Sequence, residues 1–165
     1  MKKTPIRGKN YLHDFLPVSL NIHILKLKDH FLLPDASPIL LFDGTCVLCN
    51  VFFQWLVKKD ISCKFYFATL QSDYGQQIIK ENGYHTNVDS VILVKDGKAY
   101  IYSEAALNAL VLLGGFYKLM GRLGLLFPRL VRDTVYQFIA KNRYKWFGQK
   151  ACMIPDHRIR KRFID

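Results

Sequence analysis

Cysteine is scarce in this sequence: its 165 residues include four, and two of them form a single C-x-x-C motif. Small secreted domains that are held together by disulfides are usually denser in cysteine, which argues against that class. The sequence also lacks internal repeats and low-complexity tracts. Since half of its residues are hydrophobic and 14% are aromatic, the chain can bury a sizeable core, and disorder along its whole length is excluded.

Long uninterrupted apolar runs are absent as well. The most apolar stretch, residues 105–127, contains Lys118 and Arg122, whereas a membrane-spanning helix needs about 20 mostly apolar residues. We interpret this stretch as helices buried in a globular domain. The N-terminus is basic, as in a signal peptide, but polar residues interrupt the apolar positions that follow, and no small-residue cleavage site is present. We therefore expect a cytoplasmic protein without a membrane span.

Acidic residues are few relative to basic ones, 13 against 24, and the imbalance is uneven along the chain. Residues 118–165 contain twelve Lys/Arg and three Asp/Glu, whereas residues 38–117 contain six and seven. This distribution indicates a near-neutral catalytic unit followed by a basic C-terminal segment. Because no nucleic-acid-binding motif accompanies the basic residues, we expect no nucleic-acid partner. Peripheral attraction of this segment to anionic lipid or to an acidic partner stays open.

The hydrophobic pattern alternates between strand and helix signatures. Residues 39–42 form a short, continuous apolar run, which is typical of a strand buried on both faces. From about Cys46 the apolar residues recur every three or four positions as far as Asp60, which predicts a helix. Similar patterns predict a strand over 64–68, a helix over 72–81, strands over 90–94 and 99–102, and helices from Glu104 onward.

The order of these elements predicts a thioredoxin-like α/β fold. A helix between the first two strands implies that they pair in parallel. The Asp96-Gly97 pair between the last two strands predicts an antiparallel hairpin, and Ser103 is expected to cap the next helix. The result is a mixed four-stranded sheet flanked by helices, with a helical extension from about residue 116. One face of that extension is expected to point inward, and it comprises Leu130, Val131, Val135, Phe138, Ile139, Asn142 and Trp146.

Residues 1–37 precede this pattern and do not share it. They end in a segment, residues 34–38, in which two prolines bracket small and polar side chains, as in a linker. We therefore expect an N-terminal appendage over residues 1–37 and one domain over residues 38–165, and the sequence assigns no role to the appendage.

The C-x-x-C motif, Cys46 and Cys49, is the most informative feature for function. Its spacing brings the two sulfurs within one helical turn, so that they can form a small reversible disulfide ring. Cys46 is predicted at the helix N-terminus, where unpaired backbone N–H groups and the helix dipole favour thiolate over thiol. This arrangement predicts thiol–disulfide exchange, with Cys46 as the attacking thiolate and Cys49 as the resolving thiol. No bound cofactor is required.

Three alternatives remain at this point. Cys46 and Cys49 could join Cys152 and His157 in a structural zinc site with three cysteines and one histidine. The pair could also be two unreactive buried cysteines, or belong to a thioredoxin-fold binding domain without turnover. Cys152 could instead act as a third redox partner, although packing is the better interpretation of a lone cysteine.

Asp43 lies three residues before Cys46 and has two interpretations. It could accept a proton from Cys49, or its carboxylate could order the turn by accepting backbone N–H groups, and the structural role is favoured. As a nearby anion it would also raise the pKa of the cysteines.

Together Asp43, Cys46 and Cys49 form the pattern D-x-x-C-x-x-C, which resembles the signature of the thiol–disulfide oxidoreductase DCC family. The similarity runs from about residue 38 to the C-terminus and includes the blocks 70–72, 89–90, 103–106, 141–148 and 152–155. The resemblance implies a thioredoxin-like fold and disulfide oxidoreductase activity. Its substrate would be a protein disulfide or a small thiol compound, and a dithiol protein or a low-molecular-weight thiol would supply the electrons.

One position departs from thioredoxin itself. Thioredoxins have a cis-proline before the third core strand, close to the dithiol, where it helps to hold the substrate backbone. In this sequence Asp89 stands at that place, and a cis bond without proline costs about 2.5–4 kcal/mol. We therefore expect substrate docking to differ from that of thioredoxin.

Overall fold

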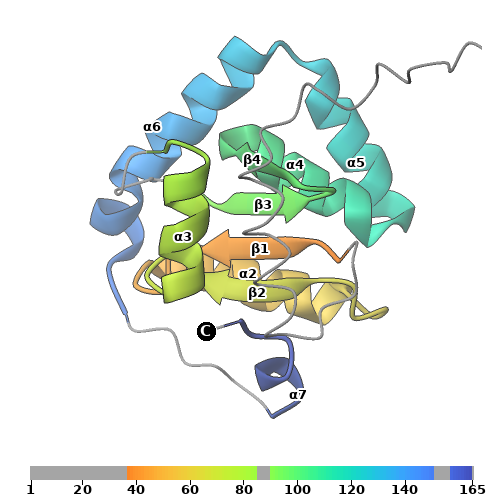
Figure 1. Ribbon diagram of the computed structural model, residues 1–165. Helices are drawn as coiled ribbons and strands as arrows, with labels where there is room; N and C mark the ends of the chain where they lie inside the picture. Colours follow the sequence, from red (N-terminus) through yellow and green to blue (C-terminus); the bar gives the residue numbers. More distant parts are fainter. Residues whose placement is uncertain (1–36, 85–89, 151–156, 165) are drawn as a thin grey trace, which may run out of the picture. The chain divides into compact units, whose positions relative to one another are not determined.

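The structure, a computed structural model, describes residues 37–84, 90–150 and 157–164. Figure 1 shows the arrangement of its helices and strands. In chain order they are β1 (Ile39–Phe42), α2 (Val47–Lys59), β2 (Tyr66–Thr69), α3 (Asp73–Glu81), β3 (Ile92–Lys95), β4 (Lys98–Ile101), α4 (Tyr102–Leu113), α5 (Gly115–Leu126), α6 (Arg129–Phe147) and α7 (His157–Arg160). The predicted boundary between an appendage and a domain at residue 37 falls where the described residues begin and stays a prediction.

The four strands form one mixed sheet in the order β2-β1-β3-β4. Strands β1 and β2 pair in parallel, whereas β3 pairs antiparallel with both β1 and β4. The β3–β4 hairpin turns at Asp96 and Gly97, whose φ values of 50° and 71° match a turn that requires two residues in the left-handed region. The thioredoxin-like α/β fold predicted from the sequence is therefore confirmed.

The hydrophobic core lies mainly on one face of the sheet. Because side chains alternate along a strand, Leu40 and Phe42 share this face, where they pack against Phe53 of α2 and Ala105 of α4. Phe42 and Phe53 are stacked with their ring centroids 4.6 Å apart. Helix α3 lies on the other face, in front of the sheet in Figure 1. The two layers hold β1 rigid where it leads into the C-x-x-C motif.

The end of the chain adds to the sheet beside β2. Phe67 donates its N–H to the carbonyl of Arg162 and accepts the N–H of Ile164, both at 2.8 Å. Phe163 lies between these contacts, and its ring meets the edge of Phe53 at 5.5 Å between centroids. Sequence patterns did not predict this pairing, because an isolated bridge at one residue, Phe163, is too short to form a periodic signal.

A buried ion pair fixes the same C-terminal residues. Asp60 follows α2 and accepts the backbone N–H groups of Lys64 and Phe65, each at 3.0 Å. Its carboxylate also pairs with Arg162, and the two side chains are 2% and 12% exposed. Arg162 in turn donates to the carbonyl of Phe65 at 2.7 Å. The turn between α2 and β2 is thus tied to the C-terminus.

Three expectations about the helices after β4 are wrong. Helix α4 begins at Tyr102, so Ser103 lies inside its first turn and contacts Asp133 rather than capping the helix. Helix α5 is not buried: Gly121 is its buried residue, and most of its large apolar side chains are exposed. The apolar face of α6 also points to solvent, since Phe138 is 60% exposed and Trp146 50%. An amphipathic pattern predicts that a helix has an apolar face, but it does not indicate what covers that face.

Membrane-spanning helices are not part of the described structure. None of the helices within the ranges given above has the length and apolarity that crossing a bilayer requires.

Candidate active site around the dithiol

The site is built on a strand, a turn and a helix. Strand β1 ends at Phe42, and the turn that follows is closed by the N–H of Cys46, which donates to the carbonyl of Asp43 at 3.3 Å. Helix α2 begins immediately after Cys46, which is its N-cap residue. The predicted position of the C-x-x-C motif at a helix N-terminus is therefore present in the structure.

Both cysteines of the motif are thiols, and they differ in access to solvent. The Cys46 sulfur accepts the N–H of Cys49 at 3.4 Å, as an N-cap side chain does. Cys46 has 0% of its surface exposed, whereas Cys49 is half-buried. Burial raises the pKa of the Cys49 thiol, and the adjacent Cys46 raises it further, while the nearby Arg143 opposes the change. Cys49 therefore keeps its proton more firmly than an ordinary cysteine does.

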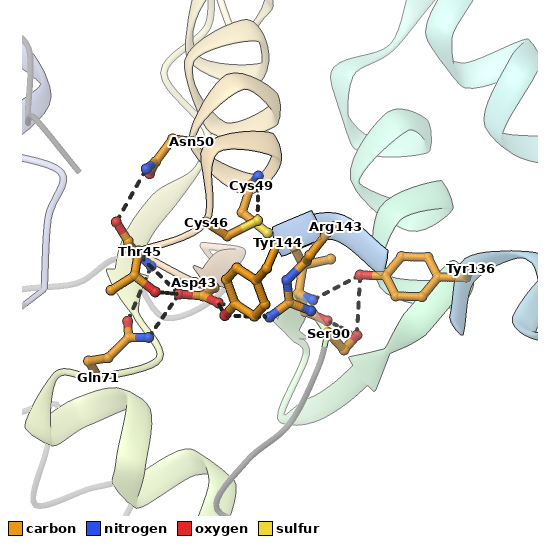
Figure 2. A network of polar contacts seen from close by, with 12 residues as sticks. Asp43, Thr45, Cys46, Cys49, Asn50, Gln71, Ser90, Tyr136, Arg143 and Tyr144 are labelled. Atoms are coloured by element: carbon orange, nitrogen blue, oxygen red, sulfur yellow. Dashed lines mark hydrogen bonds and ion pairs between the residues drawn. The ribbon is translucent and has the colours of Figure 1, made fainter. Parts of the chain in front are cut away.

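Asp43 is the centre of a polar network beside the cysteines (Figure 2). One carboxylate oxygen accepts the N–H and the hydroxyl of Thr45, at 2.9 and 2.8 Å, and the side-chain amide of Gln71 at 3.0 Å. The other oxygen accepts the Arg143 guanidinium at 2.8 Å and the Tyr144 hydroxyl. Every one of these donors stabilises the ionised carboxylate.

This network outweighs the cost of burial. Burial by itself raises the pKa of Asp43, but the hydrogen bonds from Tyr144, Thr45 and Arg143 lower it from 3.8 to about 2. The Arg143 and Asp43 side chains are each 5% exposed, so the pair is buried as a unit. Tyr144 shows the converse effect, because burial and its hydrogen bond to Asp43 raise its pKa. Asp43 is therefore ionised, and Tyr144 neutral, throughout the physiological pH range.

A short segment after α6 covers the first cysteine. Gln149 forms an isolated antiparallel bridge with Cys46, and the N–H of Lys150 donates to the carbonyl of Thr45 at 3.0 Å. The side-chain amide of Asn50 donates to the carbonyls of Lys150, at 3.3 Å, and Gly44, at 3.2 Å. Arg143 and the segment that covers Cys46 thus both come from the C-terminal third of the chain.

A second group of hydrogen bonds lies on the other side of Arg143 in Figure 2. The Tyr136 hydroxyl accepts the N–H of Val91 at 3.0 Å, and the Ser90 hydroxyl accepts the N–H of Tyr102 at 2.6 Å. Burial is the main cause that raises the pKa of Tyr136, so this hydroxyl stays protonated. These bonds fix the segment before β3 against α6 and against the start of α4.

The structure brings together the three site residues predicted from the sequence, Asp43, Cys46 and Cys49. The four residues that bond to the Asp43 carboxylate were not among the predicted site residues, and they are Thr45, Gln71, Arg143 and Tyr144. Three of them lie in the blocks 70–72 and 141–148 of the family resemblance, but nothing in a helical basic-aromatic run shows that it folds back onto a distant turn. Several expectations lie outside the described residues: the substitution of Asp89 for the cis-proline, and the participation of Cys152 in redox chemistry or zinc binding. The side chain of His157 is likewise not described.

Within the described ranges, no three histidine, cysteine or acidic side chains are grouped so as to hold a metal ion. The zinc alternative depends on residues beyond these ranges, and it stays untested.

Comparison with known proteins places the chain in a family. Residues 40–149 match the model of the DCC1-like thiol-disulfide oxidoreductase family. The chain belongs to this family. It is 45% identical over 128 residues to the uncharacterized protein YuxK of Bacillus subtilis, an alignment that covers 76% of the chain and 93% of the relative. It is 34% identical over 136 residues to the DCC family protein At1g52590, chloroplastic, of Arabidopsis thaliana, covering 76% of the chain and 73% of the relative.

No solved structure matches the chain significantly. The resemblance to the DCC family drawn from the D-x-x-C-x-x-C pattern is confirmed by the family match. The matched region ends at residue 149, so it includes Arg143, Tyr144 and most of the segment that covers Cys46.

Proposed function

We propose that the chain is a thiol–disulfide oxidoreductase in which Cys46 attacks a substrate disulfide and Cys49 resolves the mixed disulfide. The observation that carries this proposal is the placement of the Cys46 sulfur at the N-cap of α2, where it accepts the N–H of Cys49. Backbone N–H groups and the positive end of the helix dipole stabilise a thiolate in this position. Thiolate, rather than thiol, is the nucleophile in disulfide exchange.

The reaction transfers two electrons from the dithiol to the substrate. The Cys46 thiolate attacks one sulfur of the substrate disulfide, the substrate S–S bond breaks, and the leaving thiolate takes a proton from water. Cys49 then loses its proton and attacks the Cys46 sulfur, which expels the second substrate thiolate and leaves a Cys46–Cys49 disulfide. A dithiol protein or a low-molecular-weight thiol reduces that disulfide again. Such donors are abundant in the cytoplasm, which is the location that we propose.

The raised pKa of Cys49 fits the resolving role. Burial raises it first, and the other leading causes are the hydrogen bond and the charge of Cys46. Once Cys46 is part of a mixed disulfide it carries no charge, so these two causes disappear while the attraction of Arg143 persists. Cys49 is then easier to deprotonate than it was in the free dithiol. This change supports an order in which Cys46 attacks first and Cys49 second.

Asp43 acts as a positioning residue in this proposal. With a pKa of about 2 it is a poor base for the Cys49 proton at neutral pH. Its contacts instead hold the turn before Cys46 through Thr45 and hold Arg143 beside the dithiol. The structural interpretation of Asp43 is therefore the one that we carry into the mechanism.

Attack by Cys46 also requires access, because this residue has no exposed surface. The segment Gly148–Lys150 has to move away from Thr45 when a substrate arrives. Two hydrogen bonds hold Lys150 there, one from its N–H to Thr45 and one from Asn50 to its carbonyl. Each such bond contributes about 0.5–1.5 kcal/mol, so a substrate that forms similar backbone bonds can replace them.

The test combines a redox titration of the full-length protein with an insulin-reduction assay. We expect one reversible two-electron couple that assigns to Cys46 and Cys49 by mass spectrometry after thiol trapping. Cys46→Ser and Cys49→Ser should each abolish insulin reduction, whereas the matched variant of the exposed thiol, Cys63→Ser, should retain it. Cys49→Ser should accumulate a mixed disulfide through Cys46. The proposal is wrong when the pair does not cycle, or when either serine variant keeps full activity.

A further inference from the structure

Helices α5 and α6 carry large apolar side chains that are exposed. On α5 these side chains recur at three- and four-residue steps, which places them on one face of the helix, and they are Phe116, Leu119, Met120, Leu123 and Leu126, each about half exposed or more. On α6 the same spacing joins Val131, Val135 and Phe138, all more than half exposed. Large apolar side chains that gather in exposed positions in this way are typical of an interaction surface.

Exposure is greatest where the two helices meet. Leu126 is 83% exposed, Phe127 63% and Leu130 84%, and we call these three residues the apolar corner. In Figure 1 the connection between α5 and α6 lies away from the sheet. Most of the surface of these three side chains is therefore available to an external partner.

Packing behind α5 prevents the helix from turning its apolar face inward. A Cβ atom added to Gly121 would lie 2.7 Å from the Leu107 carbonyl oxygen, and one added to Gly124 would lie 2.5 Å from the Leu107 side chain. The inner face of α5 is thus in close contact with α4 and uses glycine to fit. The outward direction of the apolar residues is consequently fixed by the fold.

Charge identifies the kind of partner. The exposed charged residues of α5 and α6 are all basic, and they are Lys118, Arg122, Arg129, Lys141 and Lys145. Asp133 is the one acidic residue between residues 115 and 147, and it already bonds to Arg129 and Ser103. A partner for this surface has to be both apolar and negatively charged.

We propose that the apolar corner docks on the surface of a bilayer that contains anionic lipids. The corner would enter the interface between headgroups and acyl chains, and Arg122 and Arg129, the exposed basic residues nearest to it along α5 and α6, would contact the lipid phosphates. A second copy of the chain would bring a basic surface against a basic surface. Residues 1–37 carry six Lys/Arg against three Asp/Glu, so they too have the wrong net sign. Electrostatic repulsion therefore disfavours both a second copy and residues 1–37 as the partner of the corner.

This docking does not depend on the dithiol. Leu130 and Arg143 are separated by thirteen residues of one helix, which corresponds to about 20 Å along its axis. Substitutions at the corner should therefore leave insulin reduction unchanged, and a failure of either proposal can be recognised separately.

The experiment is co-sedimentation of the full-length protein with lipid vesicles. We expect binding to vesicles of mixed phosphatidylcholine and phosphatidylglycerol, little binding to phosphatidylcholine alone, and weaker binding as salt is raised. The double variant Leu126→Ser/Leu130→Ser should lower the affinity at least about tenfold, because each leucine loses its apolar contact. Ile61→Ser is the matched control, since Ile61 is 91% exposed but lies in the turn after α2. Its binding should equal that of the unchanged protein.

Several results would overturn the proposal. These are the absence of binding to the anionic vesicles, equal binding to neutral vesicles, or an equal loss of binding in Ile61→Ser. Size-exclusion chromatography with light scattering covers the second-copy alternative. An oligomer that the double leucine variant converts to a monomer would show that the corner binds another chain instead.

Discussion

Two buried aspartates stand at opposite ends of helix α2, and they are built in the same way. Asp43 precedes the helix and Asp60 follows it, and each accepts backbone N–H groups from residues just after it. Each also pairs with an arginine about 100 residues later in the chain, Asp43 with Arg143 and Asp60 with Arg162. The two pairs differ in their surroundings. The Asp60 pair fixes the C-terminal segment to the fold, whereas the Asp43 pair lies beside the dithiol.

The surroundings of each arginine define its role. Arg162 lies over the ring of Phe67, with its guanidinium carbon 5.0 Å from the ring centroid. It also bonds to Asp60 and to the carbonyl of Phe65, and none of these contacts involves a cysteine. Arg143 lies over the ring of Tyr144 at 4.6 Å and acts electrostatically on Cys49. The same ion-pair chemistry therefore fastens a C-terminal segment in one case, and adds a fixed positive charge to the dithiol in the other.

Removing the anchor should have the largest effect on stability. Asp60→Ala leaves Arg162 buried without its carboxylate and leaves two N–H groups unsatisfied, so we expect the free energy of unfolding to fall by about 3–5 kcal/mol. Urea denaturation measures this loss. The reduction potential of the dithiol should not change in the protein that remains folded.

Asp96→Asn is the control for that variant, because its partner Lys95 is 35% and Asp96 63% exposed. Exposed pairs contribute about 0–1 kcal/mol, so this variant should unfold almost like the unchanged protein. A similar loss in both variants would show that burial is not what makes the Asp60 pair important.

The second prediction concerns acid and the Asp43 pair. The pKa of Asp43 is lowered from 3.8 to about 2 in the folded protein, so the folded state favours the ionised carboxylate more than the unfolded state does. The stability that results is complete above about pH 4 and is lost as the pH falls toward 2, with a total on the order of 2 kcal/mol.

Asp43→Asn removes this titration and should flatten the stability profile between about pH 4 and pH 2, as measured by urea denaturation at each pH. Gln71→Ala tests the assignment, because it removes a donor to Asp43 without removing the carboxylate. Its acid dependence should lie closer to that of the unchanged protein. Equal slopes for the unchanged protein and Asp43→Asn would show that other carboxylates cause the acid sensitivity.

The sequence was sufficient to predict the sheet, its first three helices and the dithiol, but not the network around it. Strand and helix periodicity are local, and so is the turn from Asp43 to Cys46, which explains why these predictions are confirmed. The contacts of Arg143 and Arg162 depend on how a C-terminal helix and tail return to the sheet, about 100 residues from their partners. No periodic pattern encodes that return.

The error at α6 has the same origin. Periodicity correctly places Val135, Phe138 and Trp146 on one face of a helix, but hydrophobicity alone does not distinguish a face in the core from a face in solvent. In the structure the buried positions of α6 are Ala140 and Arg143 instead. A small residue and an arginine with a carboxylate partner allow α6 to approach α2 and the turn before it. The surface that a helix packs against thus decides which of its faces is buried. A count of hydrophobic residues does not detect a face that is buried through an arginine.

The smallest of the three effects, and the one that decides the role of Arg143, is a shift in redox potential. Arg143 places a positive charge near the dithiol, and the proposed reactive form of the reduced pair carries a thiolate that the disulfide lacks. Arg143→Gln should therefore destabilise the dithiol relative to the disulfide. The reduction potential of the dithiol should become more negative. If the thiolate loses stabilisation equivalent to one pKa unit, the potential shifts by about 30 mV. Arg143→Lys keeps the charge without the planar pairing to Asp43, and it should recover part of the shift. Equilibration with glutathione buffers measures both. Arg162→Gln provides the comparison, because it removes a largely buried guanidinium, 12% exposed against 5% for Arg143, at the other end of α2 and should leave the potential unchanged. A potential that moves equally in both variants, or in neither, would mean that the two ion pairs do the same structural work and that the positive charge at the dithiol has no redox role.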